Sequence, residues 1–105
     1  MSEYRVAITT CPDQRTAEEL ASWLIDQRLA ACVNVIPGVR SYYEWKGRVC
    51  NDAEFILLMK TRADRYPRLE KTIVERHPYE LPEVIAMPIE AGLAGYLGWI
   101  DEQTG

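Results

Sequence analysis

The segment 30–61 constrains the fold more than any other part of the sequence. Read as two strands, it forms one hairpin that turns at residues 46–47. The first arm, 31–46, holds 16 residues and would extend ~53 Å if straight, at ~3.3 Å per residue. A compact chain of this length is only ~33 Å across. The arm must therefore bend, and Pro37 and Gly38 are the natural place, or its far end must project and pair with another chain.

The remaining pattern predicts an α+β fold of the ferredoxin-like βαββαβ type, in a single domain over residues 1–105. Asp13 and Asp64 are placed to act as N-caps, each before a segment with helical spacing of apolar residues. The expected elements are a strand at 4–10, a helix to about residue 28, the hairpin strands at 31–46 and 48–61, a helix at 65–76, a strand at 84–87 and a short C-terminal helix at 94–101.

The two crossover helices are expected on the same face of the sheet, because right-handed crossovers place them there. Residues 55–59 and 84–87 are apolar on both faces of their strands. The face without helices therefore needs another cover. A second copy of the chain is the simplest one, and it agrees with the overlong hairpin.

Charge and composition exclude several functional classes. The net charge is −4, so the basic surface typical of nucleic-acid binding is not expected. No apolar run is long enough to span a membrane. The N-terminal residues lack the regions of a signal peptide, and the three cysteines are widely spaced. We therefore expect a cytoplasmic protein without disulfides.

A set of short motifs, in order along the chain, resembles the CutA divalent-cation tolerance family. The matching segments are Cys-Pro-Asp at 11–13, Leu-Ala-Ala-Cys-Val-Asn at 29–34, Ile-Pro-Gly at 36–38, Tyr-Glu-Trp-Lys-Gly at 43–47, Lys-Thr-Arg at 60–62, His-Pro-Tyr-Glu at 77–80, Pro-Glu at 82–83, Pro-Ile at 88–89, Tyr-Leu at 96–97 and Trp-Ile at 99–100. The resemblance implies a compact homotrimer whose hairpin arms cross between subunits, similar in architecture to PII-type signalling proteins. It also implies a role in tolerance of copper and other divalent metals, and in animal members an anchoring role for acetylcholinesterase.

Cys11, His77 and Glu80 are the candidate metal ligands. The copper site proposed for the family uses a cysteine after the first strand and the histidine of the His-Pro-Tyr motif, which correspond to Cys11 and His77. Thiolate and imidazole suit copper and zinc. Some members carry a second histidine where this chain has Arg76, and a closed zinc site takes four ligands, so neighbouring chains or carboxylates such as Glu80 must contribute. The alternative is structural: His77 ends a helix and Cys11 ends a strand.

Tyr43, Trp45, Lys60 and Tyr79 are the candidate cleft or interface residues. The aromatic side chains can line a ligand cleft or pack between subunits. Lys60 can bind an anion between subunits, as in PII-like proteins, or remain a solvated lysine at a strand end.

No catalytic motif is present, so we expect no enzymatic activity. The leading hypothesis is a cytoplasmic homotrimer that binds copper or another divalent cation, with no required cofactor. The alternative is a PII-like regulator that binds a small anion or an unidentified partner protein at clefts between subunits. A small hydrolase on the same fold is the least favoured reading.

Overall fold

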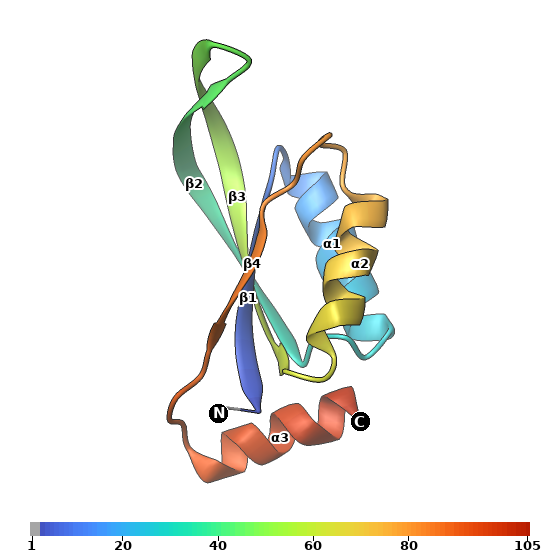
Figure 1. Ribbon diagram of the computed structural model, residues 1–105. Coiled ribbons are helices and arrows are strands. Elements are labelled where there is room, and N and C mark those ends of the chain that lie inside the picture. Colours follow the sequence, from blue (N-terminus) through green and yellow to red (C-terminus); the bar gives the residue numbers. More distant parts are fainter. Residues whose placement is uncertain (1–2) are drawn as a thin grey trace.

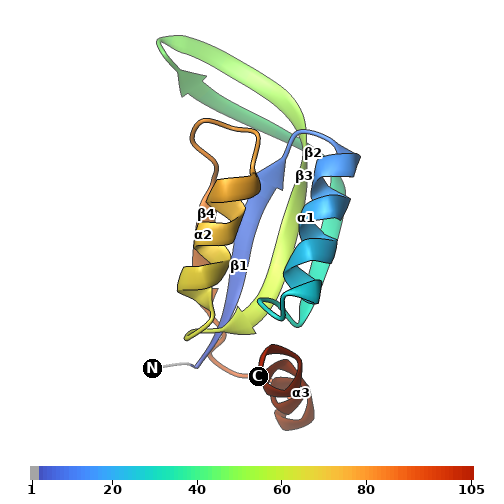
Figure 2. The ribbon, with the colours of Figure 1, turned by 90° about the vertical axis from the view of Figure 1, so that its right-hand side faces the viewer.

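The computed structural model describes residues 3–105 and has the predicted α+β architecture. Its elements are β1 (Tyr4–Cys11), α1 (Gln14–Asp26), β2 (Cys32–Trp45), β3 (Arg48–Arg62), α2 (Tyr66–Arg76), β4 (Val84–Pro88) and α3 (Ala94–Thr104). The strands form one antiparallel sheet in the order β2-β3-β1-β4, which is the ferredoxin-like arrangement. As Figures 1 and 2 show, α1 and α2 cover one face of this sheet, and α3 lies at the end remote from the hairpin turn.

The two crossover helices begin differently. Asp13 caps α1 as predicted, because its carboxylate accepts a hydrogen bond from the Thr16 backbone N–H at 2.7 Å. The predicted cap of α2 is wrong: Asp64 does not cap it, and its carboxylate instead lies 3.1 Å from Arg62 Nε. Pro67 instead lies in the first turn of α2. A proline is favourable there because it lacks the backbone N–H that would otherwise have no partner within the helix.

The long hairpin both bends and projects. The pairing register of β2 and β3 shifts between Ile36 and Val39, and Gly38 at the bend has φ +77°, a conformation that glycine adopts without strain. Lys46 and Gly47 both have positive φ, 51° and 78°, as a tight type I′ hairpin turn requires. The far half of the hairpin extends well beyond the helices (Figure 1), in a molecule that measures 45 × 25 × 23 Å.

One face of the sheet forms the core together with α1 and α2. Ala7, Leu57 and Met59 point to this side and have no exposed surface, because side chains alternate between the two faces of a strand. The helices contribute residues at helical spacing on their inner faces, namely Ala17, Leu20 and Leu24 from α1 and Leu69 and Ile73 from α2.

The opposite face of the sheet is also apolar, and neither α1 nor α2 covers it (Figure 1). The strand register places seven partly exposed hydrophobic side chains on this side, which we call the open face: Val6, Ile8, Ile36, Ile56, Leu58, Ile85 and Met87. Ile85 and Met87 are 51% and 50% exposed. The uncovered face expected from the sequence is therefore present.

Three arginines fix α3 at the end of the sheet. Arg65 Nε donates to the Thr104 carbonyl oxygen at 2.7 Å, and Arg62 donates to the same oxygen at 3.3 Å. Arg28 donates to the carbonyl oxygens of Glu102 and Gly105. The last carbonyls of a helix lack partners within it and carry partial negative charge, so these guanidinium groups bind and stabilise this end of α3.

Candidate functional site

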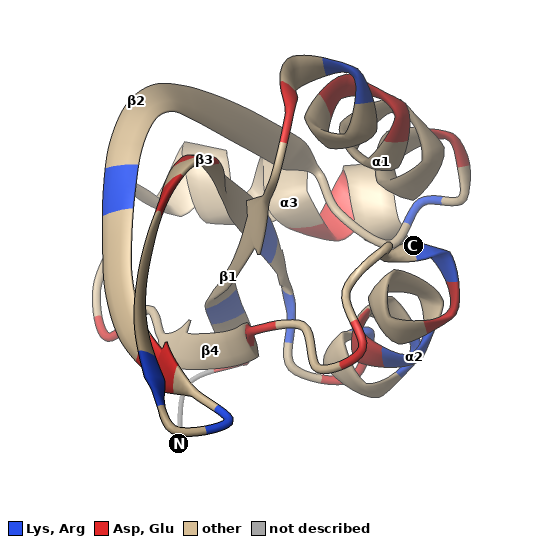
Figure 3. Ribbon diagram, turned by 90° about the horizontal axis from the view of Figure 1, so that it is seen from above, with Lys and Arg blue, Asp and Glu red and all other residues tan. Residues whose placement is uncertain are grey.

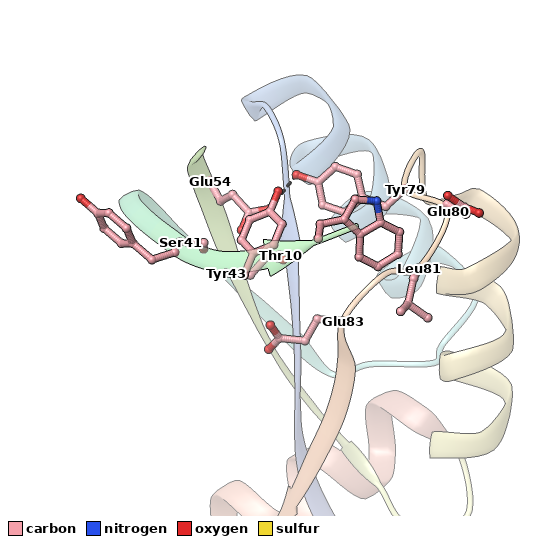
Figure 4. Close-up of a pocket in the computed structure, with 10 residues that line it drawn as sticks. Thr10, Ser41, Tyr43, Glu54, Tyr79, Glu80, Leu81 and Glu83 are labelled. Carbon is pink, nitrogen blue, oxygen red and sulfur yellow. Dashed lines mark hydrogen bonds between the residues drawn. The ribbon is translucent and has the colours of Figure 1, made fainter. Parts of the chain in front are cut away.

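A pocket of about 530 Å³ lies between the bent hairpin and the α2–β4 connection, residues 77–83 (Figure 4). Residues from four segments line it because the bend brings the far half of the hairpin over the end of β1. They are Thr10 of β1, Ser41, Tyr42, Tyr43 and Trp45 of β2, Glu54 of β3, and Tyr79, Glu80, Leu81 and Glu83 of the connection.

Two tyrosine–carboxylate pairs shape the pocket. The Tyr79 hydroxyl donates to Glu54 Oε2 at 2.6 Å (Figure 4), and the Tyr43 hydroxyl donates to Asp52. Burial and the bond to Glu54 raise the pKa of Tyr79, and the bond to Asp52 raises the pKa of Tyr43 to about 12. Both hydroxyls therefore keep their protons at neutral pH and act as donors to the carboxylates.

The pocket has an acidic lining. Among the described residues that form it, Glu54, Glu80 and Glu83 carry charge and no Lys, Arg or His takes part. Lys46 lies at its mouth, with Nζ 3.8 Å from Glu80 Oε2 and 5.8 Å from the centre of the Trp45 ring. Figure 3, which looks down from the hairpin end, shows acidic segments on both the hairpin and the connection before β4. This arrangement favours cations over anions.

Cys11, the first predicted metal ligand, lies in the core on the helix-covered side of the sheet. It has no exposed surface and belongs to the buried cluster under α1 and α2. Burial, with the nearby charges of Asp13 and Glu54, raises the pKa of its thiol to about 11. The thiol is therefore protonated at neutral pH, whereas metal coordination uses the thiolate.

His77, the second predicted ligand, has both ring nitrogens engaged. Nε2 lies 2.6 Å from the Thr10 carbonyl oxygen, which can only accept, so Nε2 carries the proton. Nδ1 accepts a hydrogen bond from the Tyr79 backbone N–H at 3.1 Å. A metal would have to displace that N–H to reach the remaining lone pair. In this structure His77 instead connects β1 to the start of the connection and holds Tyr79 in place.

The three predicted metal ligands do not come together within one chain. Glu80 is exposed at the pocket mouth, while Cys11 lies in the core and His77 bonds to backbone atoms. Over residues 3–105, no three His, Cys, Asp or Glu side chains are grouped closely enough to hold a metal ion.

Three of the four predicted cleft residues do come together. Tyr43, Trp45 and Tyr79 all line the pocket. Lys60 does not: its ammonium donates to the Asn34 side-chain oxygen and lies 4.0 Å from Cys32 Sγ, on the part of the hairpin inside the domain. The sequence placed Lys60 at a strand end, whereas β3 runs on to Arg62 and pairs Lys60 with Val6 and Cys32 in the sheet.

Glu54 is the buried carboxylate among the pocket residues that the sequence reasoning missed. It precedes the apolar run of β3 and resembles the solvated carboxylates of the hairpin tip. A signal was available in the alternation of the strand, which places Glu54 on the same face as Ile56 and Leu58. A carboxylate in phase with buried or interface residues is a candidate for function, and Glu54 is 6% exposed.

The reactivity of the cysteine thiols tests whether Cys11 is buried in the core. We expect Cys50, which is partly exposed on the hairpin, to react with a thiol reagent such as Ellman's reagent before Cys11 does. Cys11 should react only after unfolding, because it is inaccessible and its thiolate is scarce below pH 11. Mass spectrometry of the modified peptides identifies the order. Modification of Cys11 in the native protein at the rate of Cys50 would contradict its placement.

A family model, protein sequences and solved structures all match nearly the whole chain, and they point to the same family. The family model described as CutA1 divalent ion tolerance protein matches residues 5–103. The divalent-cation tolerance protein CutA of Thermus thermophilus is 43% identical over 100 residues, which cover 95% of this chain and 97% of that protein. Protein CutA of Mus musculus is 44% identical over 98 residues, and the match spans 55% of its length. The crystal structure of CutA from Xylella fastidiosa superposes with a TM-score of 0.97 at 38% identity, covering 99% of this chain and 100% of that one.

The relatives are named for different compartments. One from Arabidopsis thaliana is called chloroplastic, and one from Archaeoglobus fulgidus is called periplasmic. Within residues 3–105, no helix has the length and apolar character needed to cross a membrane.

The extent of the sequence match and the agreement in structure show that this chain belongs to the CutA1 divalent ion tolerance family.

Proposed function

We propose that this protein is a cytoplasmic homotrimer that binds divalent cations, with metal ligands supplied by more than one subunit, and that it is not an enzyme. Membership of the divalent ion tolerance family supports the link to cations. The observation that carries the proposal is the acidic pocket, whose mouth carboxylates Glu80 and Glu83 are exposed and lie beside a sheet face that needs a partner.

The open face supports assembly. Burial of apolar surface contributes ~25 cal/mol per Å², and large exposed apolar patches are uncommon on monomers. Seven hydrophobic side chains of this face are partly exposed in the single chain. The projecting half of the hairpin gives each subunit an arm that can reach a neighbour. Two or more copies packed on these faces would bury surface that the chain leaves in water.

Shared ligands follow from where the pocket lies. Thr10 and Glu54, which line it, point to the same side of the sheet as Ile8, Ile56 and Leu58 of the open face. A neighbouring subunit on that face would border the pocket. Because one chain lacks a group of three ligands within its described residues, the mouth carboxylates need donors from that neighbour.

Copper is the ion for which Cys11 and His77 are suited, and both remain candidate ligands from the family resemblance. Their use requires two changes from the present geometry. The Cys11 thiol must lose its proton and reach the metal, and His77 must give up its bond from the Tyr79 N–H. Carboxylates such as Glu80 need neither change, so we assign them the first contact with the cation.

Calorimetric titration with Cu²⁺ and Zn²⁺ tests the ligands. We expect Glu80→Gln to weaken binding at least ~10-fold, since loss of groups that bind or orient a metal costs ~10–100-fold. The affinities of Cys11→Ala and His77→Ala test separately whether these two residues bind the metal, as the family resemblance implies. Glu90→Gln, an exposed carboxylate outside the pocket, is the matched control. Equal affinity in all of these proteins would rule out the proposed ligands.

The alternative of an anion-binding regulator receives no support from this pocket, whose charged lining is acidic. A thermal-shift screen of anionic metabolites tests this alternative. A ligand at 100 times its Kd would stabilise the protein by ~2.7 kcal/mol. A shift of that size with an anion, and none with divalent cations, would favour the regulator over the cation-binding function.

A further inference from the structure

Glu54 is a buried carboxylate that faces a pocket without a cationic partner. It is 6% exposed, and the Tyr79 hydroxyl is its hydrogen-bond donor. A carboxylate has about four acceptor positions, so most of its capacity is unused. Among the ion pairs of residues 3–105, none involves Glu54. Burying a carboxylate beside a neutral donor and no opposite charge is costly, which points to a cationic donor that enters the pocket.

The interior of the pocket, behind the mouth carboxylates, also has walls that suit an organic cation. The rings of Tyr43, Trp45 and Tyr79 line the same cavity as Glu54. Aromatic faces attract ammonium groups within ~6 Å but give a metal ion no ligand atoms. The volume of about 530 Å³ lies within the ~300–1,000 Å³ range of small-molecule sites.

The chain already places an ammonium group at the pocket mouth. Lys46 Nζ lies 3.8 Å from Glu80 Oε2 and 5.8 Å from the centre of the Trp45 ring. Its position shows that a primary ammonium is accommodated there by one carboxylate and one ring. Glu83 is a second carboxylate of the lining, and it forms none of the ion pairs found among the described residues.

From these contacts we propose that the pocket binds a small protonated alkylamine, with one ammonium on Glu54 and, in a diamine, the second on Glu83. Lys46 then acts as an internal competitor at the mouth. This site goes beyond metal binding: its main carboxylate, Glu54, lies inside the pocket, and only the second ammonium of a diamine shares Glu83 with the proposed metal site.

Calorimetric titration with 1-butylamine and 1,4-diaminobutane tests the site, in phosphate buffer with a chelator so that divalent metal plays no part. We expect Glu54→Gln to weaken binding of both amines at least ~10-fold, because an ammonium bonds more strongly to a carboxylate than to a neutral amide oxygen. Glutamine keeps an acceptor for the Tyr79 hydroxyl, so the pocket wall is retained. Glu83→Gln should weaken the diamine and leave the monoamine unchanged.

Two further variants make the result specific. Lys46→Gln should tighten binding ~3-fold, because it removes a competing ammonium whose exposed ion pair with Glu80 is weak. Glu90→Gln should bind both amines as the wild type does, and circular dichroism checks that each variant is folded. The proposal is overturned if neither amine binds wild type at millimolar concentration, or if Glu54→Gln binds them as tightly as wild type. A failure of metal binding leaves this result unaffected because the chelator is present throughout.

Discussion

Replacement of Leu58 by lysine is expected to convert the proposed trimer into monomers. Leu58 lies on the open face, between Ile8 of β1 and Asn34 of β2 in the sheet register. Closing an apolar interface over a lysine ammonium would cost several kcal/mol, since the charge would lose water without gaining a partner. In the separated chain the same lysine is solvated, so the subunit itself remains folded.

Sedimentation velocity at micromolar concentration measures this change, and far-UV circular dichroism reports whether the subunit is folded. Val74→Lys is the matched control, because Val74 is 54% exposed on α2, on the side of the molecule away from the open face. We expect this control to sediment as wild type. An unchanged sedimentation coefficient for Leu58→Lys would remove the open face from the proposed interface.

Replacement of the preceding residue, Leu57, by alanine is expected to act on the subunit core instead. Leu57 has no exposed surface and faces α1 and α2 in the buried cluster. Removing a buried leucine side chain leaves a cavity, and such changes lower the free energy of unfolding by ~2–5 kcal/mol. Leu57→Met, which nearly conserves volume, should cost less than ~1.5 kcal/mol.

Urea unfolding at one fixed protein concentration measures the difference, because assembly makes apparent stability depend on concentration. Leu57→Ala should retain the sedimentation coefficient of wild type under native conditions. A loss below ~1 kcal/mol would show that Leu57 is not packed as described. Together, the neighbouring Leu57 and Leu58 separate subunit stability from assembly, since alternate residues of a strand face opposite sides.

Most of the fold could be predicted because its determinants are local. Asp13 before helical apolar spacing marks the start of α1, and Pro37 with Gly38 marks the bend in the hairpin. Pro88 at the end of β4 suits an edge strand, where it lies in the observed strand order. The cap of α2 was wrong because Asp64 had a competing partner in Arg62, which the sequence pattern does not reveal.

The site was predictable only in part because it depends on contacts between distant segments. Tyr43, Trp45 and Tyr79 were found from their aromatic character and meet in the pocket. Glu54 was missed because its burial depends on the Tyr79 hydroxyl, 25 residues away in sequence. Likewise, the backbone groups of Thr10 and Tyr79 occupy both ring nitrogens of His77. Spacing along the chain cannot show this.

If the open face is an interface between copies of this chain, a neighbouring subunit lies beside the acidic pocket. Sedimentation equilibrium of the wild-type protein across the micromolar range measures this assembly. We expect a single species with three times the mass of one chain. A monomer throughout that range would contradict the assembly and the shared metal site that depends on it.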